Sequence, residues 1–413
     1  MKITLHDSLN EERGASEAAD LLEACVHCGF CLATCPTYID SRDERDSPRG
    51  RIYLIKEFLE TGDASRQTQQ HLDRCLTCRS CETTCPSGVQ YGALSDRGRA
   101  LLETAVPRSA AQRGLRLMLR GVLSRPSLFG PLIIAGQWLQ PILPAKLARK
   151  VPRRQQLPAL PHTRHARRML IAEGCVQAAA TPATSAAVRR VLDQLEIETV
   201  AAPQAGCCGA VNYHLAAHDA ALDNARRNID AWWPELQAGA EAIVSSASGC
   251  GTQLVEYGEL LAHDPDYADR AAQVAASVRD ISEILESEDL SQLQVSSPYQ
   301  RIALQTPCSL THGLKRADTL RTILHQLGFT LTTTFDDHLC CGSAGTYSLL
   351  QSEISQRLRI NKLRALQSDA PDVIVSANVG CQLHLDETAD VPVMHWIELI
   401  NAAITTQPEG HTH

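Results

Sequence analysis

The chain has 413 residues, which is enough for two or three domains with hydrophobic cores. Its net charge of −8 gives no reason to expect a nucleic-acid partner. The N-terminal residues are acidic and polar and lack the apolar run of a secretory signal. A chain that stays in the cytosol meets reducing conditions, so we interpret its 16 cysteines as metal ligands or redox groups rather than as disulfides.

The first motif in chain order is a four-cysteine run, C-x2-C-x2-C-x3-C-P, which occurs at 25–36 and again at 75–86. In bacterial ferredoxin runs of this spacing, three cysteines bind one [4Fe–4S] cluster and the fourth binds the other cluster. We therefore expect two [4Fe–4S] clusters that share the two runs crosswise. The expected ligands are Cys25, Cys28, Cys31 and Cys85 for cluster 1, and Cys75, Cys78, Cys81 and Cys35 for cluster 2.

The spacing favours iron–sulfur clusters over zinc. Zinc takes four ligands in widely separated pairs, whereas each run places three cysteines within seven residues and then recurs. Two clusters that share their ligands lie close together in one small module. An electron that enters one cluster can pass to the other, which predicts electron transfer.

Between the two runs, the segment "DSPRGRIYLIKEFLETGD" predicts a helix that starts at Pro48 and stops at Gly62. Its cations are Arg49, Arg51 and Lys56. They either offset the negative charge of thiolate-bound clusters or form a solvated helix face, and the sequence leaves both interpretations open.

A basic segment follows, with eleven Arg, two Lys and no Asp or Glu from Thr104 to Ala172. Residues 126–145 carry no charge, close to the ~20 residues that span a bilayer, but their prolines and glycines predict a broken helix rather than a span. The Leu and Arg residues of 113–123 predict an amphipathic segment. This segment either docks on a partner or on the chain's own second half, or lies on an anionic membrane surface.

The other eight cysteines form an internal repeat. Each cysteine of the second copy follows its counterpart by 133 residues, or by 131 for the last pair. Within each copy, apolar strands precede the cysteines, and α/β sheets gather ligands at the carboxyl ends of their strands. We interpret the eight as a functional thiol site or a further cluster: Cys175, Cys207, Cys208 and Cys250 in the first copy, and Cys308, Cys340, Cys341 and Cys381 in the second.

The double run followed by the cysteine-rich repeat resembles the iron–sulfur subunits of bacterial glycolate oxidase (glycolate dehydrogenase) over nearly the full length. Related subunits serve anaerobic glycerol-3-phosphate dehydrogenase and lactate utilisation. The resemblance implies a multidomain α+β and α/β fold, in which a helical two-cluster ferredoxin-like domain precedes two duplicated α/β cysteine-rich (CCG) domains. The expected ranges are 1–104 for the two-cluster domain, 105–165 for the basic linker, 166–295 for copy 1 and 296–413 for copy 2.

The resemblance also implies a function. Flavoprotein partner subunits that carry FAD oxidise glycolate to glyoxylate, and this chain relays the electrons towards membrane quinone. The chain itself is expected to hold no catalytic residue, and it has no Gly-x-Gly-x-x-Gly after a predicted strand. The expected location is the cytoplasm, at the periphery of the inner face of the cell membrane.

One departure from the family pattern concerns the end of each copy. The full cysteine-rich motif ends in C-x2-C, whereas here Gln253 and His384 stand at the last position. This argues against the double-cuboidal clusters of heterodisulfide reductase. Four thiols still suffice for one [4Fe–4S] cluster per copy, and pooled ligands or a metal-free site are the alternatives. His384 is expected to be a hydrogen-bonded structural residue rather than a ligand.

Two further functions are alternatives to the relay. A thiol–disulfide or heterodisulfide reductase would use the adjacent cysteine pairs of the repeat, Cys207–Cys208 and Cys340–Cys341. A redox sensor would use the clusters without passing electrons on, but two clusters in series favour electron flux. Partners that oxidise lactate or glycerol 3-phosphate would need the same kind of subunit.

Overall fold

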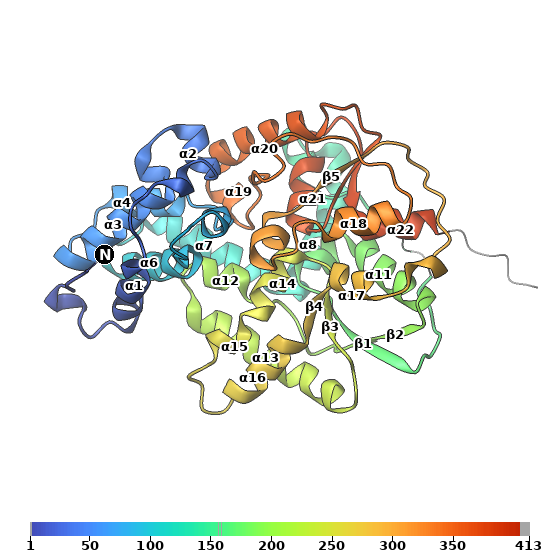
Figure 1. Ribbon diagram of the computed structural model, residues 1–413, viewed down its shortest axis with the longest axis horizontal. Coiled ribbons are helices and arrows are strands. Elements are labelled where there is room, and N and C mark those ends of the chain that lie inside the picture. Colours follow the sequence, from blue (N-terminus) through green and yellow to red (C-terminus); the bar gives the residue numbers. More distant parts are fainter. Residues whose placement is uncertain (1, 156, 158, 405–413) are drawn as a thin grey trace, which may run out of the picture.

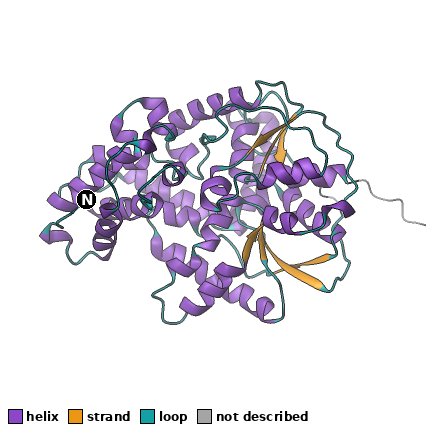
Figure 2. Ribbon diagram, in the orientation of Figure 1, coloured by secondary structure: helices purple, strands orange, loops and turns teal. Residues whose placement is uncertain are grey.

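The computed structural model describes residues 2–155, 157 and 159–404. A helical N-terminal module occupies one side of the molecule, and two small parallel sheets covered by helices occupy the other (Figures 1 and 2). The predicted class, a helical two-cluster domain followed by two α/β copies, is confirmed. The predicted ranges also include residues 1, 156, 158 and 405–413, which lie outside the described part of the chain.

The N-terminal module is built from short helices around one apolar core. Helix α1 packs against α6 and α3, and Leu22, Ile55 and Phe58 are buried between them. The helices are α1 (Arg13–Glu23), α2 (Pro36–Ser41), α3 (Pro48–Thr61), α4 (Arg66–Asp73), α5 (Ser80–Thr83) and α6 (Tyr91–Ala105).

The predicted helix between the two cysteine runs is confirmed as α3. The Ser47 side chain accepts a hydrogen bond from the Gly50 N–H, and Pro48 takes the first helical position, where a missing N–H costs nothing. Gly62 ends the helix in the left-handed region, with φ 72°. The caps fix where α3 begins, and thereby which of its side chains point towards the cysteines.

The linker folds into α7 (Ala110–Leu123), α8 (Pro126–Leu139), a 3-10 turn (Gln140–Ile142) and α9 (Ala145–Ala148). One face of α7 and α8 packs against copy 1, at α12 and α10 respectively, so docking on the chain's own second half is observed. The expectation of a broken segment over 126–145 is confirmed, since α8 ends at Leu139 and a 3-10 turn and an extended Leu143 precede α9, although Pro131 lies inside α8 without breaking it. By length and composition, no single described helix could cross a membrane; α7 and the stretch to Ile142 pass together only as a pair bent by 95°.

Copy 1 is a four-stranded parallel sheet in the order β2-β1-β3-β4. Leu170 of β1 pairs with Ile243 of β3, and Ile243 pairs with Val278 of β4. Its elements are β1 (Arg167–Ala172), α10 (Val176–Ala180), α11 (Pro182–Gln194), β2 (Ile197–Ala201), α12 (Ala210–His214), α13 (His218–Gln237), β3 (Ile243–Ser245), α14 (Ser248–Val255), α15 (Tyr257–Leu260), α16 (Ala268–Ser277), β4 (Val278–Asp280) and α17 (Ile281–Ser287).

Copy 2 repeats this order with a three-stranded parallel sheet, β5-β6-β7. The counterpart of β2 is reduced to an isolated bridge between Leu331 and Ile302, where copy 1 has a five-residue strand. The elements are β5 (Ile302–Gln305), the π-helical turn η6 (Ser309–Gly313), α18 (Thr319–Gln326), α19 (Tyr347–Leu350), α20 (Ser352–Leu366), β6 (Val373–Ser376), α21 (Val379–Asp386), β7 (Val393–His395) and α22 (Trp396–Ala403).

The two copies share one hydrophobic core. Helix α17 of copy 1 packs against α18 of copy 2, and α22 of copy 2 packs against α11 of copy 1. The core contains Ile171 and Val191 from copy 1 and Ile323, Val375 and Trp396 from copy 2. The repeat is therefore one rigid support for the cysteines of both copies.

Candidate metal centres

The two cysteine runs fold into the same loop. In the first run His27 and Gly29 have φ 55° and 84°, and in the second run the equivalent Thr77 and Arg79 have φ 54° and 60°. A left-handed conformation costs a residue with a side chain roughly 1–2 kcal/mol. Both runs adopt it twice between their first and third cysteines, which curls the loop and turns three thiols towards one point.

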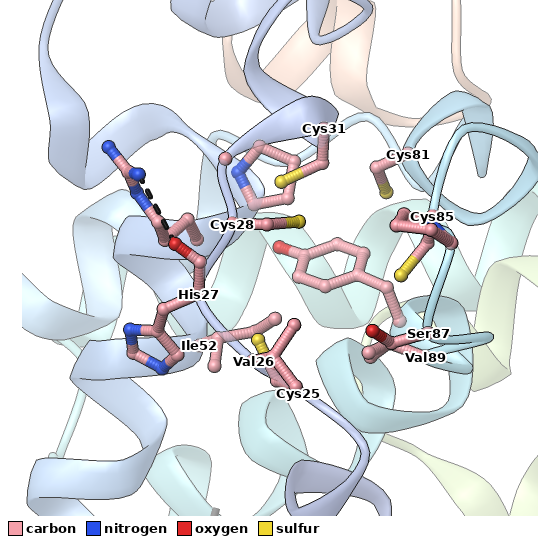
Figure 3. Close-up of a pocket in the computed structure, with 15 residues that line it drawn as sticks. Cys25, Val26, His27, Cys28, Cys31, Ile52, Cys81, Cys85, Ser87 and Val89 are labelled. Carbon is pink, nitrogen blue, oxygen red and sulfur yellow. Dashed lines mark hydrogen bonds between the residues drawn. The ribbon is translucent and has the colours of Figure 1, made fainter.

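The expected cluster 1 residues surround a common pocket. Cys25 follows α1, Cys28 and Cys31 follow in the curled loop, and Cys85 comes from the second run after α5. Their sulfur atoms point into the same space (Figure 3). Cys81, an expected cluster 2 residue, lines the same pocket. The structure thus brings the four together across the two runs.

The expected cluster 2 residues also lie together. The thiols of Cys78, Cys75 and Cys35 are electrostatic neighbours of Cys81 and, after burial itself, raise the pKa of Cys81 well above its usual value. Cys35 belongs to the first run, so the crossing is present here too. Burial opposes ionisation of Cys75 as well, but the charges of Arg51 and Arg99 outweigh burial and lower its pKa.

These two sites fit thiolate-bound iron–sulfur clusters. Each gathers four cysteine thiols, and [4Fe–4S] clusters are held by four cysteine thiolates. Burial, together with the thiols of Cys35 and Cys25, raises the pKa of Cys31 to about 11, so these sulfurs need a cation before they can ionise together. Tyr91 lines the pocket, and its buried hydroxyl lies within reach of the Cys75 thiol.

The cations of α3 divide between the two interpretations that the sequence left open. Lys56 forms an ion pair with Glu60 on the same helix, as a solvated face does. Arg49 is half-exposed and binds Glu44. Arg51 is buried beside the thiols of the cluster 2 site. Sequence reasoning missed Tyr91 and Arg99, because only the packing of α6 brings them to the cysteines.

The copy 1 site gathers its four thiols at the carboxyl ends of the strands, as expected. The sulfur atoms of Cys175 and Cys207 are 3.4 Å apart, and Cys208 and Cys250 interact alongside them. The thiols of Cys175 and Cys208 donate to Cys207 and lower its pKa well below the usual value, although burial opposes this. The Gly209 N–H also points at the Cys207 sulfur, at 3.5 Å.

The copy 2 site has the same plan. The sulfur atoms of Cys341 and Cys381 are 3.2 Å apart, those of Cys308 and Cys340 are 4.0 Å apart, and the Gly342 N–H lies 3.5 Å from the Cys340 sulfur. A hydrogen bond with Cys340 and then burial raise the pKa of Cys308 well above its usual value. Four thiols in each copy again form a soft donor set that suits iron–sulfur or zinc chemistry.

The two positions that depart from the family motif are both buried. Gln253 has no hydrogen-bond partner for its Nε2 atom among the described residues. The Nε2 atom of His384 lies 3.2 Å from the Ser355 hydroxyl, and burial lowers the pKa of His384 to about 4. His384 is thus a neutral, hydrogen-bonded side chain in this structure.

The copy 2 site borders the cluster 2 site. Cys340, Tyr347 and Leu76 are buried in one apolar contact, against which Cys78 and Cys308 pack. After burial, the Cys308 thiol is the largest contributor to a strongly raised pKa of Cys78. Two thiols from modules far apart in the sequence therefore lie beside each other.

Polar contacts hold this junction in place. The hydroxyl of Thr83 lies 2.6 Å from His312 Nδ1, and the Tyr347 hydroxyl donates to the Arg74 carbonyl at 3.1 Å. Helix α2 also packs against α20, which lie next to each other in Figure 1. The alignment of the two sites is thus fixed by several elements.

The copy 2 site is joined to the copy 1 site in turn. Ser309 follows Cys308, and its hydroxyl lies 2.8 Å from that of Ser248. The Thr252 hydroxyl donates to the Ser309 carbonyl at 3.2 Å. Ser248 and Thr252 flank Cys250 on α14. A continuous line of thiol sites therefore runs from the N-terminal module through copy 2 to copy 1.

Comparisons with known proteins agree with this arrangement. A family described as a 4Fe-4S dicluster domain matches residues 21–89, and one described as a cysteine-rich domain matches 169–255 and 302–386. The chain is 49% identical to the glycolate oxidase iron-sulfur subunit of Escherichia coli (strain K12), covering 98% of this chain and 99% of that protein. The chain belongs to the family of glycolate oxidase iron-sulfur subunits.

Other relatives fit the same picture. A probable glycolate oxidase iron-sulfur subunit of Bacillus subtilis (strain 168) is 29% identical, over 91% of this chain and 90% of that protein. Lactate utilization protein A of the same organism is 26% identical, over 48% of this chain and 83% of that protein. The resemblance inferred from the cysteine spacing is confirmed. As a glycolate oxidase iron-sulfur subunit, the chain is part of an oxidoreductase complex with partner subunits.

Proposed function

We propose that this chain is the iron–sulfur electron-transfer subunit of a flavin-dependent glycolate dehydrogenase complex. FAD-bearing partner subunits oxidise glycolate to glyoxylate, and this chain conducts the electrons towards membrane quinone. The 49% identity over nearly the full length supports glycolate as the substrate of the complex. The lactate relatives match about half of the chain at lower identity, so lactate is the second choice.

The residues that would hold the clusters are those that the two runs bring together. Cys25, Cys28, Cys31 and Cys85 would hold one [4Fe–4S] cluster, and Cys35, Cys75, Cys78 and Cys81 the other. Bound there, the clusters would supply one-electron redox chemistry. The four thiols of each copy would hold a further cluster.

The observation that carries this proposal is that Cys78 and Cys308 pack against one buried cluster that contains Cys340, close enough for their thiols to interact electrostatically. A redox sensor or a structural metal site has no use for thiol sites that border one another from one module to the next. A relay needs this proximity. The order that we propose for the relay, cluster 1, cluster 2, copy 2, copy 1, is supported by this packing.

Electrons enter where the first site meets the surface. Cys28 is exposed, and Val26 and Phe30 beside it keep 68% and 64% of their surface accessible. Exposed apolar side chains around a ligand position are typical of a docking surface. We assign this surface to the flavoprotein partner, because the partner's flavin must come close to the first thiol site.

The far end of the line lies beneath the linker. Helix α8 packs on α10, which directly follows Cys175 of the copy 1 site. Its outer face exposes Leu132, Ile134 and Trp138, and the linker is rich in Arg. An apolar face with basic flanks suits an anionic lipid surface. We assign this face to the inner surface of the cell membrane, which puts quinone next to the last site and the protein on the cytoplasmic side.

The test compares the chain alone with the complex. The anaerobically reconstituted chain is expected to be brown and reducible by dithionite, yet to oxidise no glycolate with a dye acceptor. Addition of the flavoprotein subunits restores glycolate oxidation, and quinone reduction then requires this chain. Glycolate oxidation by the purified chain alone would contradict the proposal. The matched control is a Cys28→Ser, Cys85→Ser double variant of the chain. If this variant oxidises glycolate as fast as the wild-type preparation, the activity comes from contaminating flavoprotein.

A second function is favoured by one observation in copy 1. Hydrogen bonds from the Cys175 and Cys208 thiols lower the pKa of Cys207, and a lowered pKa favours the thiolate that attacks in disulfide exchange. In that case the reduced, metal-free chain reduces one substrate disulfide to two thiols while Cys207 and Cys175, whose sulfurs are 3.4 Å apart, are oxidised to a disulfide, and Cys207→Ser abolishes the reaction. The relay is retained if Cys207→Ser instead lowers the iron content of the protein.

A further inference from the structure

Arg51 is a buried charge without a full counter-charge. Its side chain is 1% exposed. Its Nε donates to the His71 carbonyl at 2.7 Å and its Nη2 to the Thr37 hydroxyl at 3.2 Å, both neutral acceptors. The nearest carboxylate oxygen, on Asp46, is 3.6 Å away. Burying a guanidinium in this way is costly unless it meets a further negative group.

Asp46 cannot neutralise Arg51 by itself, because it is shared. One oxygen of its carboxylate lies 2.8 Å from His71 Nδ1, and the other accepts from Arg74 at 3.0 Å. Two arginines thus face one carboxylate. Arg99 adds a third cation beside the same thiols, donating to the Cys75 carbonyl at 2.6 Å, although it lies 3.6 Å from Asp96.

The excess positive charge is directed at the cluster 2 site. The Thr37 hydroxyl, which accepts from Arg51, lies 3.3 Å from the Cys35 sulfur. Arg51 also interacts electrostatically with the thiols of Cys75 and Cys35. Because Arg51, Cys35 and Cys75 are all buried, solvent and salt screen the attraction between them only weakly.

The cluster 1 site receives a weaker field from the same helix. Arg49 stands two residues earlier on α3, and its Nη1 reaches the His27 carbonyl at 3.5 Å. Its side chain is 34% exposed, and its Nε is bound by Glu44 at 2.8 Å. One carboxylate and the solvent both offset this charge. Helix α3 therefore presents to cluster 1 a cation that Glu44 and solvent offset, and to cluster 2 a buried cation that shares Asp46 with Arg74 and His71.

We propose that Arg51 is the fixed positive charge that places the reduction potential of cluster 2 above that of cluster 1. Arg51 is a positioning residue in this account, since it touches no substrate. A buried cation favours the reduced, more negative state of a nearby cluster. One electron then leaves reduced cluster 1 and enters oxidised cluster 2, with no bond made or broken. The inference rests on the ligand assignment in the proposed function.

The experiment is an EPR-monitored redox titration of the anaerobically reconstituted full chain. The Cys28→Ser variant, which alters the cluster 1 signal, identifies which signal belongs to which cluster. In Arg51→Met, the cluster 2 potential is expected to fall by ~59 mV or more. This moves the equilibrium for one electron shared between the clusters towards cluster 1 by roughly tenfold or more. The cluster 1 potential stays the same. Arg51→Lys keeps the charge and retains most of the difference.

A second variant decides the question if Arg51→Met fails to fold. Asp46→Asn keeps the shape and removes the negative charge from the same network, so the cluster 2 potential is expected to rise. Arg49→Gln is the matched control on α3 and leaves the cluster 2 potential unchanged. The inference is overturned if Asp46→Asn or a folded Arg51→Met leaves the cluster 2 potential where it was. A wild-type chain without two cluster signals would instead overturn the proposed function, so the two failures are distinguishable.

Discussion

The two copies of the cysteine-rich repeat hold matching thiol sets but have different neighbours. In copy 2, the turn η6 that follows Cys308 is covered by α5, the helix that carries Cys81. In copy 1 the counterpart α10, which follows Cys175, is covered by α8 of the linker. One position of a duplicated fold thus contacts the N-terminal module in one copy and an apolar surface helix in the other. Duplication supplies two similar thiol sites, and the elements that cover them give each its place in the relay.

The largest expected effect is the loss of quinone reduction when a cysteine of either copy is removed. The matched substitutions are Cys341→Ala in copy 2 and Cys208→Ala in copy 1. Both variants of the complex are expected to lose quinone reduction by more than the roughly 10- to 100-fold that changes next to metal ligands cause. In Cys208→Ala the copy 2 site is still reduced by electrons from cluster 2, whereas in Cys341→Ala it is not reduced. EPR of the glycolate-reduced complex measures which sites are reduced.

Reduction of a dye at the exposed cluster 1 site is the control for this pair, and it is expected to be unchanged in both variants. Normal quinone reduction in Cys341→Ala would remove copy 2 from the path and break the comparison.

Iron removal is expected to loosen the copy 2 junction but not the copy 1 contact with α8. Metal binding contributes to folding wherever the ligands come from several segments, and the N-terminal module depends on eight such thiols. We expect a loss of about 3 kcal/mol in the stability of this module, the effect of a ligand at roughly 100 times its Kd. Hydrogen exchange of α2 and α20 should rise, while that of α8 and α10 stays constant. Equal changes at both contacts would contradict the account.

Each copy has a buried helix cap whose pKa is shifted, and the two shifts have opposite signs. Asp280 caps α17 in copy 1, and burial raises its pKa to about 6; His395 caps α22 in copy 2, and burial lowers its pKa to about 4. As pH falls from 6.5 to 4, the unfolded state protonates the histidine and the native state does not, which costs ~3 kcal/mol. As pH rises from 3.8 to 6, Asp280 stays protonated only in the native state, so stability falls by ~3 kcal/mol.

Single substitutions separate these opposing contributions. His395→Asn is expected to remove the loss on acidification, and Asp280→Asn the loss between pH 3.8 and 6, since asparagine caps a helix without a charge. Urea unfolding from pH 4 to 7.5 measures both slopes. Parallel slopes in the two variants would show that the caps are not the source.

The smallest expected effect concerns the apolar face over copy 1. Trp138→Ser and Leu132→Ser each remove an exposed side chain whose burial in lipid is worth ~1.5–3 kcal/mol. Binding to vesicles with anionic lipid is therefore expected to fall about tenfold or more. Leu349→Ser and Ile360→Ser, at exposed apolar residues of copy 2, are the matched controls. If all four variants bind alike, α8 is not the membrane face.

Local spacing made much of the molecule predictable. The cysteine runs, the Pro48 and Gly62 limits of α3, and the strand–cysteine order of each copy are short-range signals, and the structure follows them. The grouping of cysteines across the two runs also follows from spacing, because three of four thiols lie in one loop. The role of His384 was predicted from the usual behaviour of isolated histidines, and it is hydrogen-bonded as expected.

Long-range packing set the limits of prediction. The sequence named Arg51 with Arg49 and Lys56 but could not separate them, because burial depends on how α3 meets α4. Cys78 and Cys308 are 230 positions apart in the sequence (308 − 78) and pack against the same buried cluster, which no local sequence pattern predicts. The shared core of the two copies, with their last helices exchanged, is also a tertiary result.

The crossing of the two cysteine runs is tested most directly by Cys85→Ala and Cys35→Ala in the anaerobically reconstituted chain. The account predicts about 16 irons per wild-type chain, four for each of the four sites. Cys85→Ala should lose the EPR signal that Cys28→Ser alters, although Cys85 belongs to the second run, and Cys35→Ala should lose the other signal. A colourless protein that takes up zinc, or a Cys85→Ala variant that loses the signal of its own run instead, would contradict the interlocked pair on which the relay depends.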